Sequence, residues 1–297
     1  MADGPALVVL LLDALSLAYR AFFALPDMRT THGEPTGALY GLSALLLKLL
    51  REQRPKGGAF ALDHPRATFR HAAFAGYKAS RPPAPTPLGR QLARLPALLA
   101  AFGFPVFAVA GFEADDVLAT LARELSRAGE APLVVSGDLD MLQCAVGPAR
   151  VHVVGRGATA GRTYDSAAVW ARFGVAPGEL PDWKALAGDV TDEIPGVPGV
   201  GGKRAAALVR TFGGISGLLA RLPEVQPDSL RAAIEARRAD LGLWRDLALL
   251  RDDVPLPAGP RFAPFTGGRH AGLRALFEEL EFRSLLPRLD QLAGAVA

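Results

Sequence analysis

Short apolar runs that end in carboxylates constrain this chain more than any other feature. Four β-rich segments share the pattern: ALVVLLLD ends at Asp13, GGAFALD at Asp63, FPVFAVAGFE at Glu113, and APLVVSGDLD at Asp138 and Asp140. Helix-periodic segments lie between them, notably residues 38–51 and 90–102. Alternating strands and helices are typical of a parallel sheet covered by helices. The sequence therefore predicts an α/β fold with a mostly parallel central sheet flanked by helices.

The carboxyl ends of parallel strands meet at one edge of the sheet, where such folds bind ligands. A single acid at a strand end is readily explained as a helix N-cap, which the macrodipole favours. The run GFEADD, however, places Glu113, Asp115 and Asp116 together at the start of one apolar helix. Their mutual repulsion raises their pKa values unless a cation lies between them. Four strands that end in this way favour one shared site over four independent caps.

Nine carboxylates form the candidate metal site: Asp13, Asp63, Glu113, Asp115, Asp116, Asp138, Asp140, Asp189 and Asp192. Residues 138 and 140 share one face of an extended chain, and the three-residue spacing of Asp189 and Asp192 suits a helical turn or a tight loop. The absence of His or Cys at ligand spacing disfavours zinc and favours Mg²⁺ or Mn²⁺. One such ion takes only one or two direct carboxylates, so the set predicts two ions, an arrangement suited to phosphodiester hydrolysis.

Composition limits the alternatives. A chain of 297 residues that is 50% hydrophobic can bury a core as one large or two smaller domains. Its single Cys144 excludes an internal disulfide, and we expect a reducing cytoplasm. The N-terminal apolar run is short and ends in an acid, which predicts a strand rather than a signal peptide or a membrane span. The net charge is only +3, but setting the nine carboxylates aside leaves a basic chain that would attract a polyanion.

Two basic segments are candidate phosphate contacts, and the first is TFRHAAFAGYKASR, residues 68–81. It interleaves Arg70, His71, Lys78 and Arg81 with Phe69, Phe74 and Tyr77. Such a mixture suits phosphates and stacked unpaired bases, and an amphipathic surface helix is the alternative. The Pro-rich stretch SRPPAPTPLG that follows, residues 80–89, predicts an exposed, mobile loop rather than regular helix.

The second basic segment is IPGVPGVGGKRAAALVRTFGG, residues 194–214. Its turns lead into a helix opened by Gly202, Lys203 and Arg204, so backbone N–H groups and two cations face whatever lies at that N-terminus. A P-loop is excluded because position 197 is Val and position 204 is Arg. An ordinary helix–hairpin turn is the alternative. After a predicted hairpin in RVHVVGRGATAGRTYD, the chain is mostly helical to its end.

Together these motifs resemble the 5′-nuclease (flap endonuclease) superfamily, most closely the 5′-3′ exonuclease domain of bacterial DNA polymerase I. The likeness extends from LLLDALSLAYRAF through GEPTGALYG, FRHAAFAGYKASR, GFEADDVLATLA, SGDLDMLQ and LAGDVTDEIPGVPGVGGKRAA to LEFRSLL. The order EADD, GDxD, GDxxD and PGVxGxGxK is a specific combination. The resemblance implies an α/β nuclease core at 1–165, with a helical arch or loop region at 64–90. It implies a helical helix–hairpin–helix DNA-binding region at 166–297.

The resemblance also assigns roles to individual residues. One set looks like the tighter metal site: Asp13, Asp63, Glu113, Asp115 and Asp116. The other looks like the second site: Asp138, Asp140, Asp189 and Asp192. The cations that would position the scissile phosphate are Arg20, Lys78 and Arg81. Tyr77 matches an aromatic at the base of the arch through which a 5′ single strand passes, and Arg70 is expected to contact DNA. The remaining set would grip duplex phosphates around a bound K⁺: Gly199, Gly201, Gly202, Lys203 and Arg204.

Three positions depart from the family pattern, namely Ala14, Ala72 and Glu193, and they put local substrate contacts in question without removing a carboxylate. The implied activity is metal-dependent cleavage of DNA at 5′ flaps, nicks and 5′ ends, in replication or repair. A non-catalytic junction-binding module is one alternative, and a ribonuclease that acts on RNA or RNA–DNA hybrids is another. We expect a monomer without a membrane partner, either as a stand-alone nuclease or as the N-terminal part of a longer protein.

Overall fold

A computed structural model describes residues 7–155, 161–265 and 270–294. Its centre is a six-stranded sheet in the order β3-β2-β1-β4-β5-β6. The strands are β1 (Val8–Asp13), β2 (Gly57–Ala61), β3 (Val106–Phe107), β4 (Ala131–Ser136), β5 (Arg150–Val153) and β6 (Arg162–Tyr164). Neighbouring strands are parallel except β5 and β6, which form the antiparallel pair expected of a hairpin. Residues 156–160, which lie between β5 and β6 in the sequence, are outside the described part of the chain. The predicted fold class is confirmed.

Strand register explains why the acids gather at one edge. In the central strand β1, Leu12 pairs with Phe60 of β2 and with Val135 of β4, so the three strands end at one level. All six residues of β1 are buried, as a strand covered on both faces requires. Because residues after these ends emerge at the same edge, Asp13, Asp63 and Asp138 lie in neighbouring positions.

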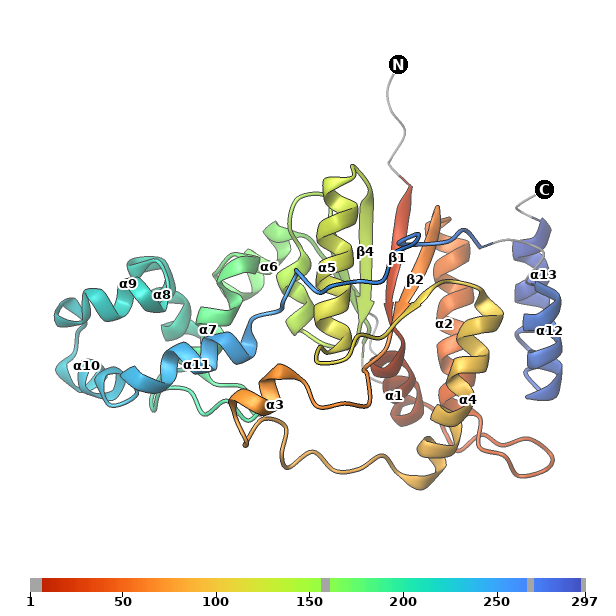
Figure 1. Cartoon of the computed structure of the whole chain (residues 1–297), viewed down its shortest axis with the longest axis horizontal. Coiled ribbons are helices and arrows are strands. Elements are labelled where there is room, and N and C mark those ends of the chain that lie inside the picture. The colour runs from red at the N-terminus through yellow and green to blue at the C-terminus, as the bar shows by residue number, and fades with distance from the viewer. Residues whose placement is uncertain (1–6, 156–160, 266–269, 295–297) are drawn as a thin grey trace, which may run out of the picture.

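Helices cover both faces of the sheet. They are α1 (Ala14–Ala24), α2 (Gly37–Gln53), α4 (Thr86–Phe102) and α5 (Ala114–Arg127). Figure 1 shows α2 and α4 on one side of the sheet and α5 on the other. Alternate residues of β1 serve the two cores: Leu10 and Leu12 pack with the α2 and α4 side, and Val9 and Leu11 with the α5 side.

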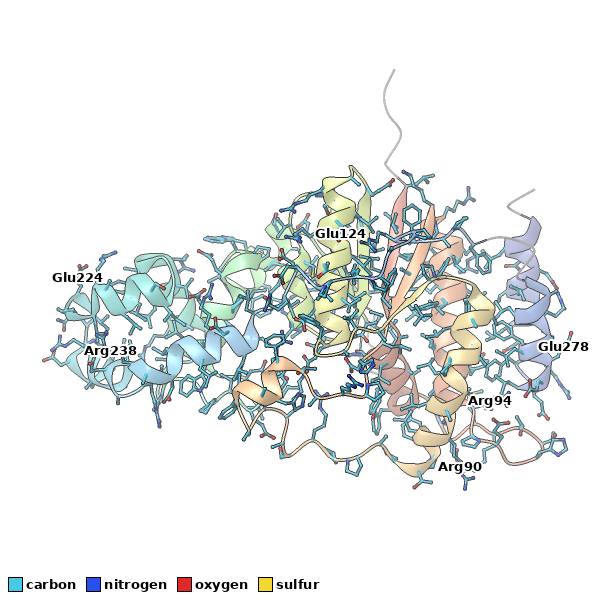
Figure 2. The ribbon with its side chains drawn as sticks, in the orientation of Figure 1. Arg90, Arg94, Glu124, Glu224, Arg238 and Glu278 are labelled. Carbon is cyan, nitrogen blue, oxygen red and sulfur yellow. The ribbon has the colours of Figure 1, made fainter. Side chains whose placement is uncertain are left out.

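A lobe of helices projects away from the sheet (Figure 1). It contains α6 (Ser166–Phe173), α7 (Leu180–Ala187), α8 (Gly202–Phe212), α9 (Ile215–Ala220), α10 (Asp228–Glu235) and α11 (Arg238–Ala248). Figure 2 shows Glu224 and Arg238 at the far end of this lobe. None of the described helices combines the length and the hydrophobicity that a membrane span requires.

The last two helices lie at the opposite end of the molecule, beside α2 and α4 (Figures 1 and 2). They are α12 (His270–Glu279) and α13 (Leu286–Gly294), and Leu273, Phe277 and Leu289 are buried in the core on the α2 and α4 side. The segment 166–297 is therefore split in space between the lobe and the core. A domain boundary at residue 165 stays a prediction.

Two local expectations need correction. The basic segment 68–81 forms helix only in α3 (Phe69–Ala73), after which it turns. The Pro-rich stretch 80–89 is irregular only as far as Pro85, because α4 begins at Thr86. Pro87 is tolerated there since the first turn of a helix leaves its backbone N–H groups unpaired.

Candidate active site

The acidic edge begins at Asp13, which ends β1 and caps α1. Its Oδ1 accepts a hydrogen bond from the Ser16 backbone N at 3.0 Å, and its Oδ2 accepts one from the Ser136 hydroxyl at 2.7 Å. Burial raises the pKa of Asp13 to about 6 against the lowering effect of these bonds, and repulsion from Asp63 and Asp138 adds to the rise. The surroundings of Asp13 therefore disfavour its negative charge, which a nearby cation would stabilise.

The N-terminus of α5 brings two further acids to this edge. Glu113 is the N-cap residue, and Asp115 lies in the first turn. Burial is the main cause that raises the pKa of Asp115, followed by repulsion from Asp13. Asp63 is exposed, and it accepts a hydrogen bond from the Ala114 backbone N at 2.8 Å. This bond joins the end of β2 to the start of α5, so the strand and the helix hold their acids side by side.

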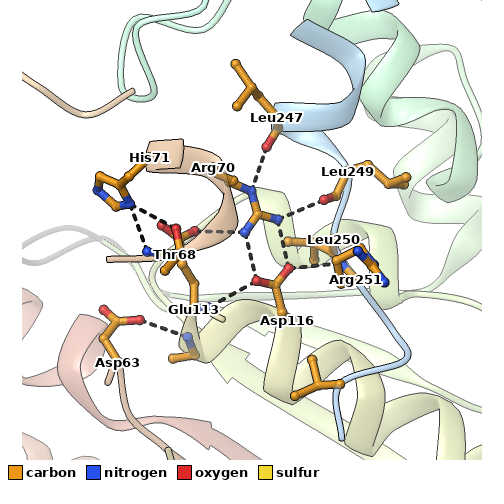
Figure 3. A network of polar contacts seen from close by, with 12 residues as sticks. Asp63, Thr68, Arg70, His71, Glu113, Asp116, Leu247, Leu249, Leu250 and Arg251 are labelled. Carbon is orange, nitrogen blue, oxygen red and sulfur yellow. Dashed lines mark hydrogen bonds and ion pairs between the residues drawn. The ribbon is translucent and has the colours of Figure 1, made fainter. Parts of the chain in front are cut away.

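Asp116 has a different environment from the other carboxylates (Figure 3). It is fully buried, and both of its oxygens accept from the Arg70 guanidinium at 2.7 Å. The backbone N–H groups of Glu113 and Arg251 donate to the same carboxylate at 3.0 and 2.9 Å. These four bonds engage the oxygens that a metal would need. In this structure Asp116 is a partner of Arg70, and its role as a metal ligand stays a prediction.

The structure does not place Arg70 where the predicted contact with DNA requires it. Its side chain is 1% exposed, and beyond Asp116 it donates to the carbonyls of Leu247 and Leu249, both at 2.8 Å (Figure 3). Although burial alone would lower it, the hydrogen bonds and charge of Asp116 raise the pKa of Arg70. A charge so enclosed ties α3 to α5 and to the end of α11, and it cannot reach a phosphate.

Tyr77 and Lys78 converge on Glu113. The Tyr77 hydroxyl donates to Glu113 Oε2 at 3.1 Å, and Lys78 Nζ lies 3.1 and 3.2 Å from its two oxygens. Lys78 Nζ is also 3.7 Å from Asp192 Oδ1. Although burial alone would lower it, Glu113 raises the pKa of Lys78, so this lysine stays charged. Tyr77 is 2% exposed, so its predicted contact with a single strand is corrected: a buried ring cannot stack on a base.

A second acidic group faces the first. One carboxylate oxygen each from Asp140, Asp189 and Asp192 lies within 4.8 Å of the others. The ammonium group of Lys184, on α7, makes ion pairs with Asp140 and Asp189. Burial alone would raise the pKa of Asp189, but the charge of Lys184 and hydrogen bonds from Lys184 and Thr191 lower it. Burial raises the pKa of Asp192.

Asp138 connects the two acidic groups. Its Oδ1 accepts from the Asp140 backbone N at 2.9 Å, and its charge acts on Asp13, Asp115 and Asp192. The carboxylates other than Asp116 therefore converge on one edge of the sheet, drawn from both halves of the chain.

Arg20 and Arg81 occupy different settings beside this edge. The Arg20 guanidinium donates to the Gly137 carbonyl, and a Cβ at position 137 would lie only 1.9 Å from Arg20 Nε. The glycine of GDLD therefore makes room for this cation beside Asp138. Arg81 is exposed, three residues after Lys78. The structure thus places Lys78 against the acids, Arg20 against the backbone next to Asp138, and Arg81 on the surface.

The glycine-rich hairpin lies at the N-terminus of α8. Gly199 has a φ of +78°, a left-handed conformation that favours glycine, and its carbonyl accepts from Arg204 Nη1 at 2.6 Å. Gly201 is the N-cap residue, and Lys203 and Arg204 are exposed in the first turn. The indole N–H of Trp183 donates to the Gly202 carbonyl at 2.9 Å. The predicted phosphate contact thus has two exposed cations at a helix N-terminus that is held by hydrogen bonds.

Sequence reasoning missed three supporting residues. Ser136 and Ser16 bond Asp13, and Lys184 neutralises the second group. The signal for Lys184 is a lone cation in the apolar stretch WKALA, five residues before Asp189. The serines carry no comparable signal.

The donor set fits hard divalent cations. It consists of carboxylate oxygens, the ligands that Mg²⁺ and Mn²⁺ prefer. Lys184 and Lys78 already place positive charge between pairs of these acids, which shows that the site favours cations. Oxygens of Asp140, Asp189 and Asp192 lie close enough together to share one ion. A second ion among the carboxylates around Asp13 stays a prediction.

A mostly parallel sheet that gathers carboxylates at one edge, together with a glycine-rich helical hairpin that exposes cations, is the arrangement that the sequence predicts for a metal-dependent nuclease. The family comparison makes the assignment specific. The chain belongs to the 5′-3′ exonuclease family: the family's N-terminal resolvase-like domain matches residues 8–174, and its C-terminal SAM fold matches residues 175–267.

Sequence relatives are DNA polymerases. The chain is 36% identical over 282 residues to DNA polymerase I of Bacillus caldotenax, and 39% identical over 278 residues to the thermostable DNA polymerase I of Thermus thermophilus. These alignments cover 95% and 94% of this chain and 32% of each relative. The chain thus spans about a third of the length of the curated relatives it matches.

Solved structures share the fold. T5 5′-exonuclease with bound zinc superposes with a TM-score of 0.68 at 19% identity, covering 97% of both chains. The catalytic core of Rad2 in complex with a DNA substrate superposes with a TM-score of 0.62 at 15% identity, covering 96% of this chain and 92% of that one.

Proposed function

We propose that this chain hydrolyses DNA phosphodiesters at 5′ flaps, nicks and 5′ ends, as a divalent-metal-dependent exonuclease and flap endonuclease. The observation that carries the proposal is the convergence of carboxylates from β1, α5, the loop after β4 and the loop after α7. A protein that only bound DNA would gain repulsion from these acids near phosphate. The full set therefore favours catalysis over a passive binding role.

The chain's own residues supply position and charge. Two divalent ions, when bound, would activate water and stabilise charge on the attacking and leaving oxygens. Lys78 lies against the acids and Arg20 beside the backbone that leads into Asp138, where both can orient a phosphate, and Arg81 is exposed. Lys203 and Arg204 offer contacts to duplex backbone at the helical hairpin.

The finer assignments belong to the same proposal. Mg²⁺ or Mn²⁺ would serve as the two ions, and K⁺ would bind at the helical hairpin. DNA is the favoured substrate over an RNA–DNA hybrid because the hairpin suits duplex phosphates. We place the protein in the cytoplasm as a monomer that takes part in DNA replication or repair. A T5 flap endonuclease has been seen with DNA and metal ions, which supports this reading of the fold.

The test is a side-by-side digestion. Purified protein is incubated with 5′-flap, nicked, blunt and RNA–DNA hybrid substrates in Mg²⁺, in Mn²⁺ and in EDTA. Cleavage of the flap in either metal and none in EDTA is expected, with Asp115→Asn as the inactive control that still binds DNA. Binding without cleavage in either metal would leave only the junction-binding alternative, and preference for the hybrid would favour the ribonuclease.

A further inference from the structure

Glu193 contacts Ser80, which lies 113 positions earlier in the chain. Its Oε1 accepts a hydrogen bond from the Ser80 backbone N at 2.7 Å and another from the Ser80 hydroxyl. Ser80 belongs to the turn that follows α3 and carries Lys78, whereas Glu193 belongs to the loop that carries Asp189 and Asp192. The contact therefore joins the two segments that face each other across the carboxylate site.

The backbone at Glu193 is held in an unusual conformation. Its φ is +58°, in the left-handed region that glycine and asparagine tolerate better than glutamate. Asp189 and Ile194 exchange two backbone hydrogen bonds of 2.8 Å, which closes the loop around this residue. A glutamate without a hydrogen-bond partner would be unfavourable in this conformation. The bonds to Ser80 give the side chain a defined partner in this conformation.

The neighbouring acid reinforces the contact. Asp192 lies 3.7 Å from Lys78 Nζ, so two consecutive acids hold residues 78 and 80 of one turn. Lys78 itself has a φ of +52°, and its ammonium group also contacts Glu113. The position of this lysine thus depends on a turn whose far side is fastened by Glu193.

We propose that Glu193 is a positioning residue that fastens the turn of Lys78 and Arg81 over the carboxylate site. The inference rests on the proposed nuclease function and names a contributor to the same site. An exposed hydrogen bond of this kind adds little to the stability of the fold. Its effect is geometric, because a displacement of about 1 Å in a positioning group lowers a catalytic rate by as much as about 100-fold.

A second physical effect acts in the opposite direction. Glu193 is only half-buried, so its charge repels a phosphate backbone that approaches the site. If repulsion were its main consequence, loss of the charge alone would strengthen DNA binding. The two effects separate in Glu193→Gln, which keeps an oxygen acceptor for Ser80 and removes the charge, and Glu193→Ala, which removes both.

The experiment compares these variants with Ser80→Ala, the double variant Ser80→Ala/Glu193→Ala, and Val190→Ala as a control in the same exposed loop. The single-turnover cleavage rate constant at saturating protein is measured on a 5′-flap DNA in Mg²⁺, and the Kd for the same DNA in Ca²⁺. We expect Glu193→Ala to lower the rate constant by about tenfold with a Kd changed less than about twofold. Glu193→Gln should recover most of the rate, the double variant should fall no further than Glu193→Ala, and the control should match the wild type.

Hydrogen exchange provides a readout that does not require cleavage. Peptides that cover residues 76–83 should exchange faster in Glu193→Ala than in the wild type and in Val190→Ala. If the wild type does not cleave DNA but exchange changes in this way, the nuclease proposal fails while the fastening of the turn stands. If the wild type cleaves and Glu193→Ala matches it in rate and exchange, the positioning inference is overturned. Equal gains in affinity for the Gln and Ala variants, without loss of rate, would also overturn it in favour of repulsion.

Discussion

Arg70 donates to both oxygens of Asp116 at 2.7 Å, whereas Glu113, Asp140 and Asp189 at the same edge pair with lysines. Both side chains are almost wholly buried, and the pair joins α3 to α5. The three acids at the start of α5 therefore have different roles. Glu113 and Asp115 face the site, and Asp116 holds the helix against its neighbours.

The buried pair predicts a large stability loss in Arg70→Met. Removal of one partner leaves a buried charge without compensation, which costs about 3–5 kcal/mol. The free energy of unfolding from urea titration measures the change. Arg251→Met is the matched control, because the Arg251 side chain pairs with Asp253 on the surface and should contribute less than about 1 kcal/mol. A loss of similar size in both variants would contradict the structural role of Arg70.

Asp115→Asn and Asp116→Asn should have opposite effects on the metal-free protein. Burial and repulsion raise the pKa of Asp115, so its charge is disfavoured in the fold and its neutral amide should preserve or increase the thermal midpoint. Asp116 neutralises Arg70, so Asp116→Asn should lower the midpoint. Thermal unfolding in EDTA measures both. Equal thermal midpoints in the two variants would show that Asp115 and Asp116 do not differ in their contribution to stability.

Stabilisation by Mg²⁺ should depend on pH. Burial raises the pKa of Asp13 to about 6, so below that pH an ion must displace a proton, and Mg²⁺ binding strengthens as the pH rises through about 6. In the metal-free protein the same shift makes stability fall as the pH rises from about 4 to about 6, because the folded state binds the proton more tightly than the unfolded chain. Thermal midpoints at pH 5 and 7.5, each with Mg²⁺ and with EDTA, measure both trends. A Mg²⁺ shift that is larger at pH 5 would refute the site.

Lys184→Met should make the protein more dependent on metal. The lysine neutralises Asp140 and Asp189. Its loss leaves three close carboxylates without that positive charge, which lowers the free energy of unfolding by about 3 kcal/mol. Mg²⁺ should restore more stability to this variant than to the wild type, because it supplies the missing charge. Unfolding curves with and without Mg²⁺ measure the difference, and an unchanged Mg²⁺ effect would argue against an ion near Lys184.

Much of the architecture could be predicted from local patterns. Apolar runs that end in acids predicted strands β1, β2 and β4 and the edge where Asp13, Asp63 and Asp138 meet. The helix after GFEADD and the one opened by Gly202 also form as predicted. Such features can be predicted from the sequence because strand alternation, helix caps and turn glycines are set by residues close together in the chain.

Only the tertiary structure decided which charged groups became partners. Arg70 and Asp116 are 46 positions apart, and nothing near either one distinguishes a buried ion pair from a metal ligand or a DNA contact. The same holds for Lys184 between its two acids and for Glu193 beside Ser80. Charge and spacing state what a side chain can bind, whereas burial and the approach of distant segments select one partner and desolvate it. The chain alone thus determined that acids gather at this edge, and the packing of the folded molecule decided which cation or hydrogen-bond donor each of them meets.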